Sequence, residues 1–448
     1  MIDNNINAVL ASGDIDQPHV FPHLDQLKTA PYIFEVDFGL KKLPLEPGIL
    51  LIRGARQYGK STWLEQQLYQ TIKTFGAGTA YYLNGDYIAD VDALTEAIET
   101  LTTAYPKNAA VRRLFIDEIT AVENWELALK RLADRGLLKK ILIVTTGSSA
   151  TDLRRGTERL PGRKGKLART TYLFTPISYR EFKRHCGKKL KEKTLVAYLL
   201  SGGSPIACTE LATTGAIPMY VIELVRDWIE GEITRSGRSR AAIMNIMNVL
   251  FRFGGTPVGQ AKLAREAGLA NNTIATNYIE ILRDLGCVTP AYPWDRDRKQ
   301  LILRKECKYH FMNLLAAVSY HPQQIRTLSD FFALSEKEQG MWYEWLVAQE
   351  ISRRMAIAGQ EILAPLAFWQ DKNHEIDFVL SNKHFLEVKR GQTSALEFAW
   401  FPKQFHRQQL TVITSKSFSA DHMNGISLEE FMLADDRDFL IASPTVDL

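Results

Sequence analysis

The sequence is poor in cysteine, with four cysteines among 448 residues. They are scattered at Cys186, Cys208, Cys287 and Cys307, and no two of them form a CxxC pair. His310 follows Cys307 closely, but one such pair falls short of a four-ligand zinc site. The pattern argues against a disulfide framework and against structural zinc, and it is typical of reduced thiols in a cytoplasmic protein.

Long apolar runs are also missing. No segment approaches the roughly 18 uninterrupted apolar residues of a membrane span. The N-terminal stretch MIDNNINAVLASGDIDQ is acidic where a signal peptide would be basic. We therefore expect a cytoplasmic location and no membrane partner.

The net charge is small, at +4, but it is unevenly distributed. Residues 151–200 contain 14 Lys and Arg against 4 Asp and Glu, a local excess of 14 − 4 = +10. Such a run is more often a solvated face or an anion-facing loop than a nucleic-acid contact. The hydrophobic content of 46% is that of a globular protein, and a chain of this length should divide into about three or four domains.

The most specific motif present is a glycine-rich loop between an apolar strand, residues 49–52, and a helical pattern. Its sequence GARQYGKS matches G-x-x-x-x-G-K-[ST]. The N–H groups of such a loop point at phosphate oxygens, and the helix N-terminus adds a positive dipole. Lys60 can reach the β- and γ-phosphates, and the Ser61 hydroxyl can ligate Mg²⁺. The predicted phosphate-binding residues are Gly54, Ala55, Arg56, Gln57, Tyr58, Gly59, Lys60, Ser61 and Thr62.

A second apolar strand, in RRLFIDEIT, runs directly into two acids, Asp117 and Glu118. An acid at the carboxyl end of a buried parallel strand lies where open α/β sheets bind their ligands. Asp117 would hold the hydration shell of Mg²⁺, and Glu118 would polarise the attacking water. The pair is a weak signal alone, but it follows Lys60 by 117 − 60 = 57 residues, about one βαβ pair.

A third apolar strand, in KKILIVTTGSSA, ends in the polar residues Thr146, Ser148 and Ser149. They lie where a sensor of the γ-phosphate would be, and capping of the next helix by Ser148 or Ser149 is an equally good explanation. Four arginines follow, of which Arg163 stands in a glycine-flanked loop. We favour Arg163 as the arginine that stabilises charge on the transferring phosphoryl group, against the alternative of a surface charge.

The motifs GARQYGKST, LFIDEI, NWELALKRLADRG, TTGSSA, TPISYREF and YLLSGGSPIA occur in this order from about Pro31 onward. They resemble a large family of prokaryotic AAA-type ATPases, near the STAND and origin-recognition ATPases, that carry a C-terminal nuclease-like domain. The resemblance implies ATP as the ligand and ATP hydrolysis coupled to a conformational change. It also implies that the Gly-Gly-Ser-Pro stretch ending at Pro205 begins a helical lid and faces the nucleotide, and that Arg163 matches the family's Gly-Arg.

A helix-turn-helix pattern occupies the middle of the chain. Helical patterns at 258–267 and 272–285 are joined by a short turn that contains Gly268, and Asn271 or Asn272 is a ready N-cap for the second helix. A hairpin with WDRDRK at its tip follows, as in a winged variant. The second helix has no basic residue before Arg283, which favours weak or shape-led DNA binding, and a protein-interaction role is the alternative.

The last domain is predicted to contain a helix, three strands and a short helix near residues 397–404, in the order of the PD-(D/E)XK nuclease fold. The stretch EIDFVLSNKHFLEVK would form two strands and a turn. Metal ligands would be Asp377 and Glu387, with Glu344, or less favoured Glu350, from the preceding helix.

Lys389 would act on the water that the metal activates. Glu375 would be an extra ligand or only a solvent-facing neighbour of Asp377. The alternative is that these are ordinary exposed charges on half-buried strands.

These motifs predict an α/β protein: a P-loop (RecA-like/AAA) parallel sheet with a helical lid, then a winged helix and an α/β PD-(D/E)XK nuclease-like domain. The expected bounds are 1–31 for an N-terminal extension, 32–178 for the ATPase core, 179–235 for the lid, 236–310 for the winged helix and 311–448 for the nuclease-like domain.

The first functional hypothesis is an ATP-hydrolysing switch whose nucleotide state controls a Mg²⁺-dependent nuclease acting on nucleic acid, DNA ahead of RNA. Its rival is a switch with an inactive nuclease fold that only binds DNA or a protein client. A third possibility is a motor that works as an oligomer. It would need an arginine that reaches into the nucleotide site of a neighbouring subunit, so the oligomeric state is not predicted.

Overall fold

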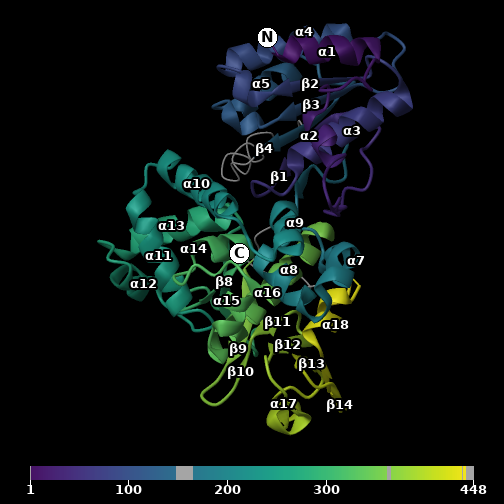
Figure 1. Cartoon of the computed structure of the whole chain (residues 1–448). Coiled ribbons are helices and arrows are strands. Elements are labelled where there is room, and N and C mark those ends of the chain that lie inside the picture. The colour runs from purple at the N-terminus through teal and green to yellow at the C-terminus, as the bar shows by residue number, and fades with distance from the viewer. Residues whose placement is uncertain (1, 148–164, 361–364, 436, 440–448) are drawn as a thin grey trace. The chain divides into compact units, whose positions relative to one another are not determined.

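The computed structural model describes residues 2–147, 165–360, 365–435 and 437–439 (Figure 1). The chain divides into two compact units, Met1–Thr175 and Pro176–Leu448, and each is described by itself. Among the described residues, no helix is both long enough and apolar enough to cross a membrane.

The first unit is built on a five-stranded sheet in the order β2-β3-β4-β1-β5, and every strand is parallel to its neighbours. The strands are β1 (Gly48–Arg53), β2 (Ala80–Asn84), β3 (Arg113–Asp117), β4 (Leu142–Gly147) and β5 (Thr171–Leu173). Because β4 lies between β1 and β3, the glycine-rich loop after β1 and the acids after β3 flank the end of β4. The predicted parallel sheet is confirmed, and its carboxyl edge brings together the glycine-rich loop, the acids Asp117 and Glu118, and Thr146.

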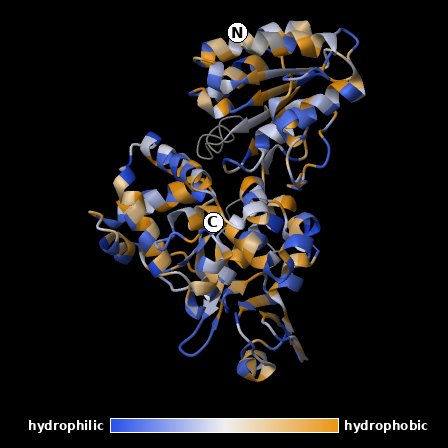
Figure 2. Cartoon of the chain, viewed as in Figure 1, coloured by the Kyte–Doolittle hydropathy of each residue, from blue (hydrophilic) through white to orange (hydrophobic). Residues whose placement is uncertain are grey.

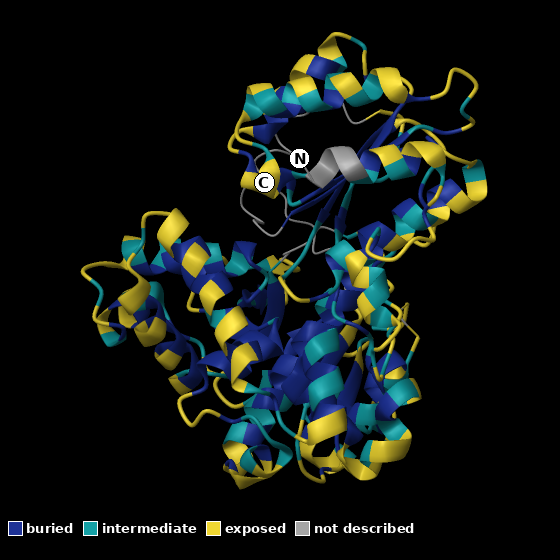
Figure 3. Ribbon diagram, turned by 45° about the horizontal axis from the view of Figure 1, so that its top comes forward, coloured by how far each residue is buried: buried dark blue, intermediate teal, exposed yellow. Residues whose placement is uncertain are grey.

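Helices cover both faces of this sheet. They are α1 (Ile2–Ser12), α2 (Pro22–Leu27), α3 (Lys60–Phe75), α4 (Val91–Ala104) and α5 (Trp125–Asp134), with short 3-10 turns η1 (Gly85–Tyr87) and η2 (Ile119–Ala121). Along β1, Ile49 and Leu51 pack in the core with α4 and α5, whereas Leu50 and Ile52 pack in the core with α1 and α3. Side chains alternate along a strand, so an apolar run supplies both cores. The helices accordingly show hydrophobic and hydrophilic sides and outward-facing exposed turns (Figures 2 and 3).

At the edge of the sheet, α1 packs against β2, and its residue Asn7 bonds the backbone of the strand. The Asn7 side-chain N–H donates to the Tyr82 carbonyl at 2.8 Å, and its carbonyl accepts from the Tyr82 N–H at 2.8 Å. These are the two bonds that a neighbouring strand would make, so Asn7 protects the edge from pairing with another chain. The N-terminal segment is therefore part of the first unit.

The second unit begins with helices where the lid was predicted. They are α7 (Tyr179–Leu190), η3 (Lys191–Lys193), α8 (Thr194–Ser201), α9 (Pro205–Thr214) and α10 (Met219–Arg235). Later helices, α14 (Leu314–Tyr320) and α15 (Leu328–Ala333), pack against α8, and α14 also packs against α10.

The helix-turn-helix elements are present in the predicted order. They are α11 (Arg240–Arg252), α12 (Gln260–Glu266) and α13 (Asn272–Asp284), then β6 (Val288–Asp295), β7 (Gln300–Leu301) and β8 (Lys308–Phe311). The side chain of Asn271 accepts from the Ile274 N–H at 3.0 Å, so Asn271 is the N-cap of α13. The predicted hairpin is β6 with β7, and β8 also pairs antiparallel with β6.

The remaining elements form two mixed sheets around a long helix. They are α16 (Glu336–Ile357), β9 (Leu366–Gln370), β10 (Glu375–Ile376), β11 (Phe378–Val379), β12 (His384–Val388), η4 (Ala395–Phe398), α17 (Phe401–Gln404), β13 (Gln409–Ile413), β14 (Phe418–Ala420), β15 (Met423–Ile426) and α18 (Leu428–Leu433). One sheet has the order β10-β9-β6-β7, with β8 beside β6, and the other has the order β11-β12-β13-β15-β14.

The strand predicted before the SNKH turn is split at Asp377. Residues before it pair with β9, whereas residues after it pair with β12. The prediction of one continuous strand was wrong here, because the chain changes sheets at this residue. Asp377 therefore lies at the junction of the two sheets.

Replacing Asn7 by Leu should weaken β2 locally, because the N–H and C=O of Tyr82 would lose both partners. We expect a cost of roughly 1–3 kcal/mol, seen as about 10- to 100-fold faster amide hydrogen exchange across residues 80–84. Ala8→Ser, at an exposed position of the same helix, is the control. Unchanged exchange in Asn7→Leu would show that the edge of β2 does not depend on this side chain.

Candidate functional site: a phosphate loop and a carboxylate cluster

The loop after β1 turns sharply because of its backbone conformation. Gln57 and Gly59 have φ of 64° and 95°, and Gly59 is the N-cap of α3, with no side-chain hydrogen bond at that cap. Positive φ favours glycine, so Gly59 is needed for the turn. Gly54 is needed for another reason: a Cβ there would lie 2.8 Å from the carbonyl oxygen of Phe174.

Lys60 is buried beneath this loop. Its ammonium donates to the carbonyls of Gly54 and Ala55, both at 2.9 Å, and the residue is only 5% exposed. Burial lowers the pKa of Lys60, although the negative charges of Glu118 and Asp117 oppose the shift. A cation held in this way by neutral carbonyls fits an anionic ligand, and a phosphate group would supply the missing charge.

Thr146, at the end of β4, connects the two acids of the neighbouring strand. Its hydroxyl donates to Oδ1 of Asp117 and accepts from the backbone N–H of Glu118 at 3.2 Å. Both Thr146 and Asp117 are buried. Glu118 has a left-handed backbone, with φ of 46°, and a side chain on Gly85 would collide with its carbonyl. The carboxylate of Asp117 and the backbone of Glu118 are thus held in place by β4 and by η1.

The other residues predicted for the nucleotide site lie elsewhere. Ser148, Ser149 and Arg163 fall outside the described residues. Pro205 is the first residue of α9, in the second unit. The roles assigned to these four residues stay predictions.

A second cluster of charges forms in the second unit around Lys308, which the sequence analysis did not identify. Its ammonium contacts Oε1 of Glu375, lies 3.2 Å from Oδ1 of Asp377 and lies 3.6 Å from Oε1 of Glu344. The Lys308 side chain is 1% exposed. Glu344 Oε1 also lies 2.8 Å from Nε2 of His310, which is two residues from Lys308 on the same face of β8.

The predicted ligands Asp377 and Glu387 are bound to the protein itself. The Asp377 N–H donates to Oε2 of Glu387 at 3.1 Å, and Oδ2 of Asp377 accepts from the Val388 N–H at 2.9 Å. Oε1 of Glu387 lies 2.5 Å from the Lys389 ammonium. Glu375 and Asp377 thus both contact Lys308, and Glu387 and Lys389 contact each other.

The acids in this cluster have different proton affinities. Burial opposes ionisation of Glu344, but Lys308 and His310 outweigh it and lower the pKa of Glu344 to about 2. Burial and the neighbouring Glu344 raise the pKa of Asp377, and burial and Asp377 raise that of Glu387. For Lys308, burial favours the neutral form, but Glu344, Asp377 and Glu375 outweigh it and raise the pKa.

The metal site predicted from Glu344, Asp377 and Glu387 stays a prediction. Among the described residues, no group of three or more His, Cys, Asp or Glu side chains could hold a metal ion. The physical reason is that Lys308 lies against the oxygens of Glu344 and Asp377, while backbone N–H groups and Lys389 bind the remaining oxygens of Asp377 and Glu387. The missed signal was a lysine two residues before a histidine in an otherwise aromatic strand, KYHF.

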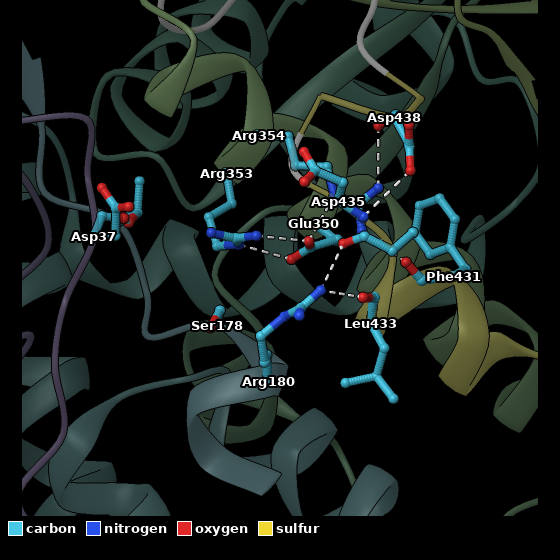
Figure 4. A network of polar contacts seen from close by, with 12 residues as sticks. Asp37, Ser178, Arg180, Glu350, Arg353, Arg354, Phe431, Leu433, Asp435 and Asp438 are labelled. Atoms are coloured by element: carbon cyan, nitrogen blue, oxygen red, sulfur yellow. Dashed lines mark hydrogen bonds and ion pairs between the residues drawn. The ribbon is translucent and has the colours of Figure 1, made fainter. Parts of the chain in front are cut away.

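Glu350, the other acid weighed for that site, belongs to a separate network (Figure 4). Its carboxylate binds Arg353 through two contacts of 2.8 Å and Arg354 through one of 2.7 Å. Arg354 in turn donates to the Phe431 carbonyl at 2.6 Å, and Arg180 donates to that of Leu433. Glu350 therefore helps to hold α18 against α16 through Arg354, whereas Arg180 links α18 to α7.

Two family models match parts of the chain. Residues 46–183 match an AAA domain, and residues 192–355 match a domain of unknown function, DUF8612. An uncharacterized protein of Methanocaldococcus jannaschii is 25% identical over 418 residues, which cover 86% of this chain and 84% of that protein.

Solved structures are similar at a lower level. A Walker-type ATPase of Pyrococcus abyssi is 12% identical with a TM-score of 0.42, over 67% of this chain and 93% of that one. The Aeropyrum pernix Orc1 protein in complex with DNA is 14% identical with a TM-score of 0.30, over 68% and 93%. The predicted nuclease-like identity of residues 311–448 gains no support from these matches and stays a prediction. Together, the family match and the loop geometry identify residues 46–183 as an AAA-type P-loop ATPase domain.

Proposed function

We propose that the protein is an ATP-hydrolysing switch, in which the nucleotide state of the AAA domain controls what the second unit binds. The observation that carries the ATPase part is the Thr146 hydroxyl, which joins Asp117 and the backbone of Glu118 at the sheet edge where Lys60 begins α3. It supports a site in which a phosphate-binding cation follows β1, a metal-binding acid and a base follow β3, and Thr146 at the end of β4 lies between the two strands.

The loop residues act first by binding. The N–H groups at the start of α3 and the ammonium of Lys60 would take the place of water around the β- and γ-phosphates. The two carbonyls that bind the Lys60 ammonium are neutral. Replacing them as its partners by negatively charged phosphate oxygens is therefore electrostatically favourable.

Ser61 and Asp117 are the residues that would hold Mg²⁺. When bound, Mg²⁺ neutralises charge that develops on the phosphate oxygens. Asp117 is oriented for this task because Thr146 donates to its Oδ1. Glu118, the next residue, would orient and deprotonate the attacking water.

Roles for three further residues and for the helix-turn-helix region come from the sequence alone. Arg163 would stabilise the transferring phosphoryl group, Ser148 would sense it, and Pro205 would begin the lid over the nucleotide. α13 and the β6–β7 hairpin would contact nucleic acid, DNA ahead of RNA, or a protein client.

Lys60→Ala should lower ATP turnover by at least about 100-fold, because the phosphate charges lose their buried partner. Glu118→Gln should lower turnover by about 100- to 10,000-fold while ATP still binds. Turnover is measured as phosphate release, and binding with a fluorescent nucleotide. Lys73→Ala, exposed in the last turn of the same helix, is the control. Unaltered turnover in Lys60→Ala would refute the ATPase assignment of this loop.

Thr146→Val should keep nucleotide binding but lower kcat by about 10- to 100-fold, because Asp117 and Glu118 lose the hydroxyl that orients them. Thr145→Val is a matched control: Thr145 is the neighbouring buried residue on β4, but its hydroxyl donates to the Leu50 carbonyl at 3.1 Å. We expect near-normal kcat in Thr145→Val. Equal losses in both variants would mean that Thr146 acts only through stability.

The second candidate function is Mg²⁺-dependent cleavage of nucleic acid by the second unit. The contact of 2.5 Å between Lys389 and Glu387, beside Asp377, favours it. The Lys308 ammonium opposes it, because it lies against Glu344 and Asp377, where a catalytic metal would bind. We expect plasmid DNA to remain intact with Mg²⁺ and ATP, as judged on agarose gels. Cleavage by the wild type that is absent in both Asp377→Asn and Lys389→Ala would establish the nuclease instead.

A further inference from the structure

Three carboxylate oxygens from two distant parts of the chain meet at one buried ammonium. Glu344 comes from α16, Glu375 begins β10, and Asp377 lies between β10 and β11. Each directs one oxygen toward Nζ of Lys308. A protein normally gathers several acids in this way only around a cation, because their mutual repulsion and desolvation must be offset.

The ammonium is fixed in place by its own strand. Lys308 begins β8, which is paired with β6, and all four residues of β8 are buried. The Nζ also lies 5.3 Å from the centre of the Phe368 ring, within the range of a cation–π contact. Withdrawal of Lys308 into water would require part of β8 to separate from its sheet, so this cation is a permanent component of the cluster.

The distances fit an ammonium and do not fit a metal alongside it. Mg²⁺ binds oxygen at about 2.0–2.1 Å and Ca²⁺ at about 2.3–2.6 Å. A divalent cation bound to Oδ1 of Asp377 and Oε1 of Glu344 would occupy the space of Nζ, which lies 3.2 Å and 3.6 Å from these oxygens. Two cations at one position would also repel each other strongly in a buried setting.

We propose that Lys308 takes the place of the divalent cation in this cluster, so that the second unit binds no metal there, and that removing the Lys308 charge creates a site for Mg²⁺, Mn²⁺ or Ca²⁺ on Glu344, Glu375 and Asp377. The consequence is that the second unit acts by binding and does not hydrolyse phosphodiesters at this cluster. The inference depends only on contacts within the second unit. Its failure would leave the proposed ATPase untouched, and the converse also holds.

The test uses the full-length protein without nucleotide and titrates it with Mn²⁺, followed by the electron paramagnetic resonance of free Mn²⁺. The wild type and its Asp377→Asn variant should give the same titration up to about 1 mM. Lys308→Met should gain about one bound Mn²⁺ with a Kd on the order of 10⁻⁴ M, the range of weak carboxylate sites. The double variant Lys308→Met with Asp377→Asn should lose it. Lys305→Met, at an exposed lysine three residues earlier, is the matched control and should gain nothing.

Thermal unfolding supplies a second measurement. Lys308→Met should have a lower Tm than the wild type because the acids lose their cation, and Ca²⁺ should raise its Tm but not that of the wild type. A Mn²⁺ site in the wild type that Asp377→Asn removes would overturn the proposal, and this arm does not require the Lys308 variant to fold. A folded Lys308→Met that binds no Mn²⁺ would overturn it equally.

Discussion

Burying a charged side chain is costly unless an opposite charge accompanies it, and the two lysines at the candidate sites meet this constraint differently. Lys308 is surrounded by the carboxylates of its own chain and has a raised pKa, so its charge is satisfied within the fold. Lys60 rests on two neutral carbonyls and has a lowered pKa. The charge of Lys308 is balanced within the fold, whereas the charge of Lys60 requires an anion from outside the chain. Lys308 is therefore a structural residue, and Lys60 belongs to a ligand site.

The sheet order of the first unit links the phosphate loop to the acids through β4. Since β4 lies between β1 and β3, the phosphate loop and the acids share one neighbour, and the Thr146 hydroxyl bonds both the carboxylate of Asp117 and the backbone N–H of Glu118. A nucleotide that draws Lys60 and Asp117 toward its phosphates and metal would change the bonds of Thr146. The backbone of Glu118, confined beside Gly85, has little freedom to adjust, so the change would be passed along β3 and β4.

Local patterns in the sequence predicted much of this. The glycine-rich loop, the acids after an apolar strand and the Asn271 cap each depend on residues within about ten positions of one another. The charge cluster around Lys308 could be predicted only in part. The strand pattern predicted that Asp377 and Glu387 act together, and the two residues are in contact. The cation that meets Glu344 and Asp377 comes from β8, however, and no short-range pattern reveals that pairing. The split of the strand at Asp377 was not predicted either, because a change of sheet partner leaves the alternation of apolar residues intact.

The strand β6 pairs with strands from two parts of the chain. It forms the antiparallel hairpin that follows the helix-turn-helix, and it also pairs in parallel with β9, with Ala291 opposite Leu366. The helix-turn-helix region and the region beyond residue 311 therefore share one hydrogen-bonded sheet. Recombination between these two parts would cut a hydrogen-bonded sheet in two, so we expect them to be inherited together and to diverge by substitution on a common scaffold.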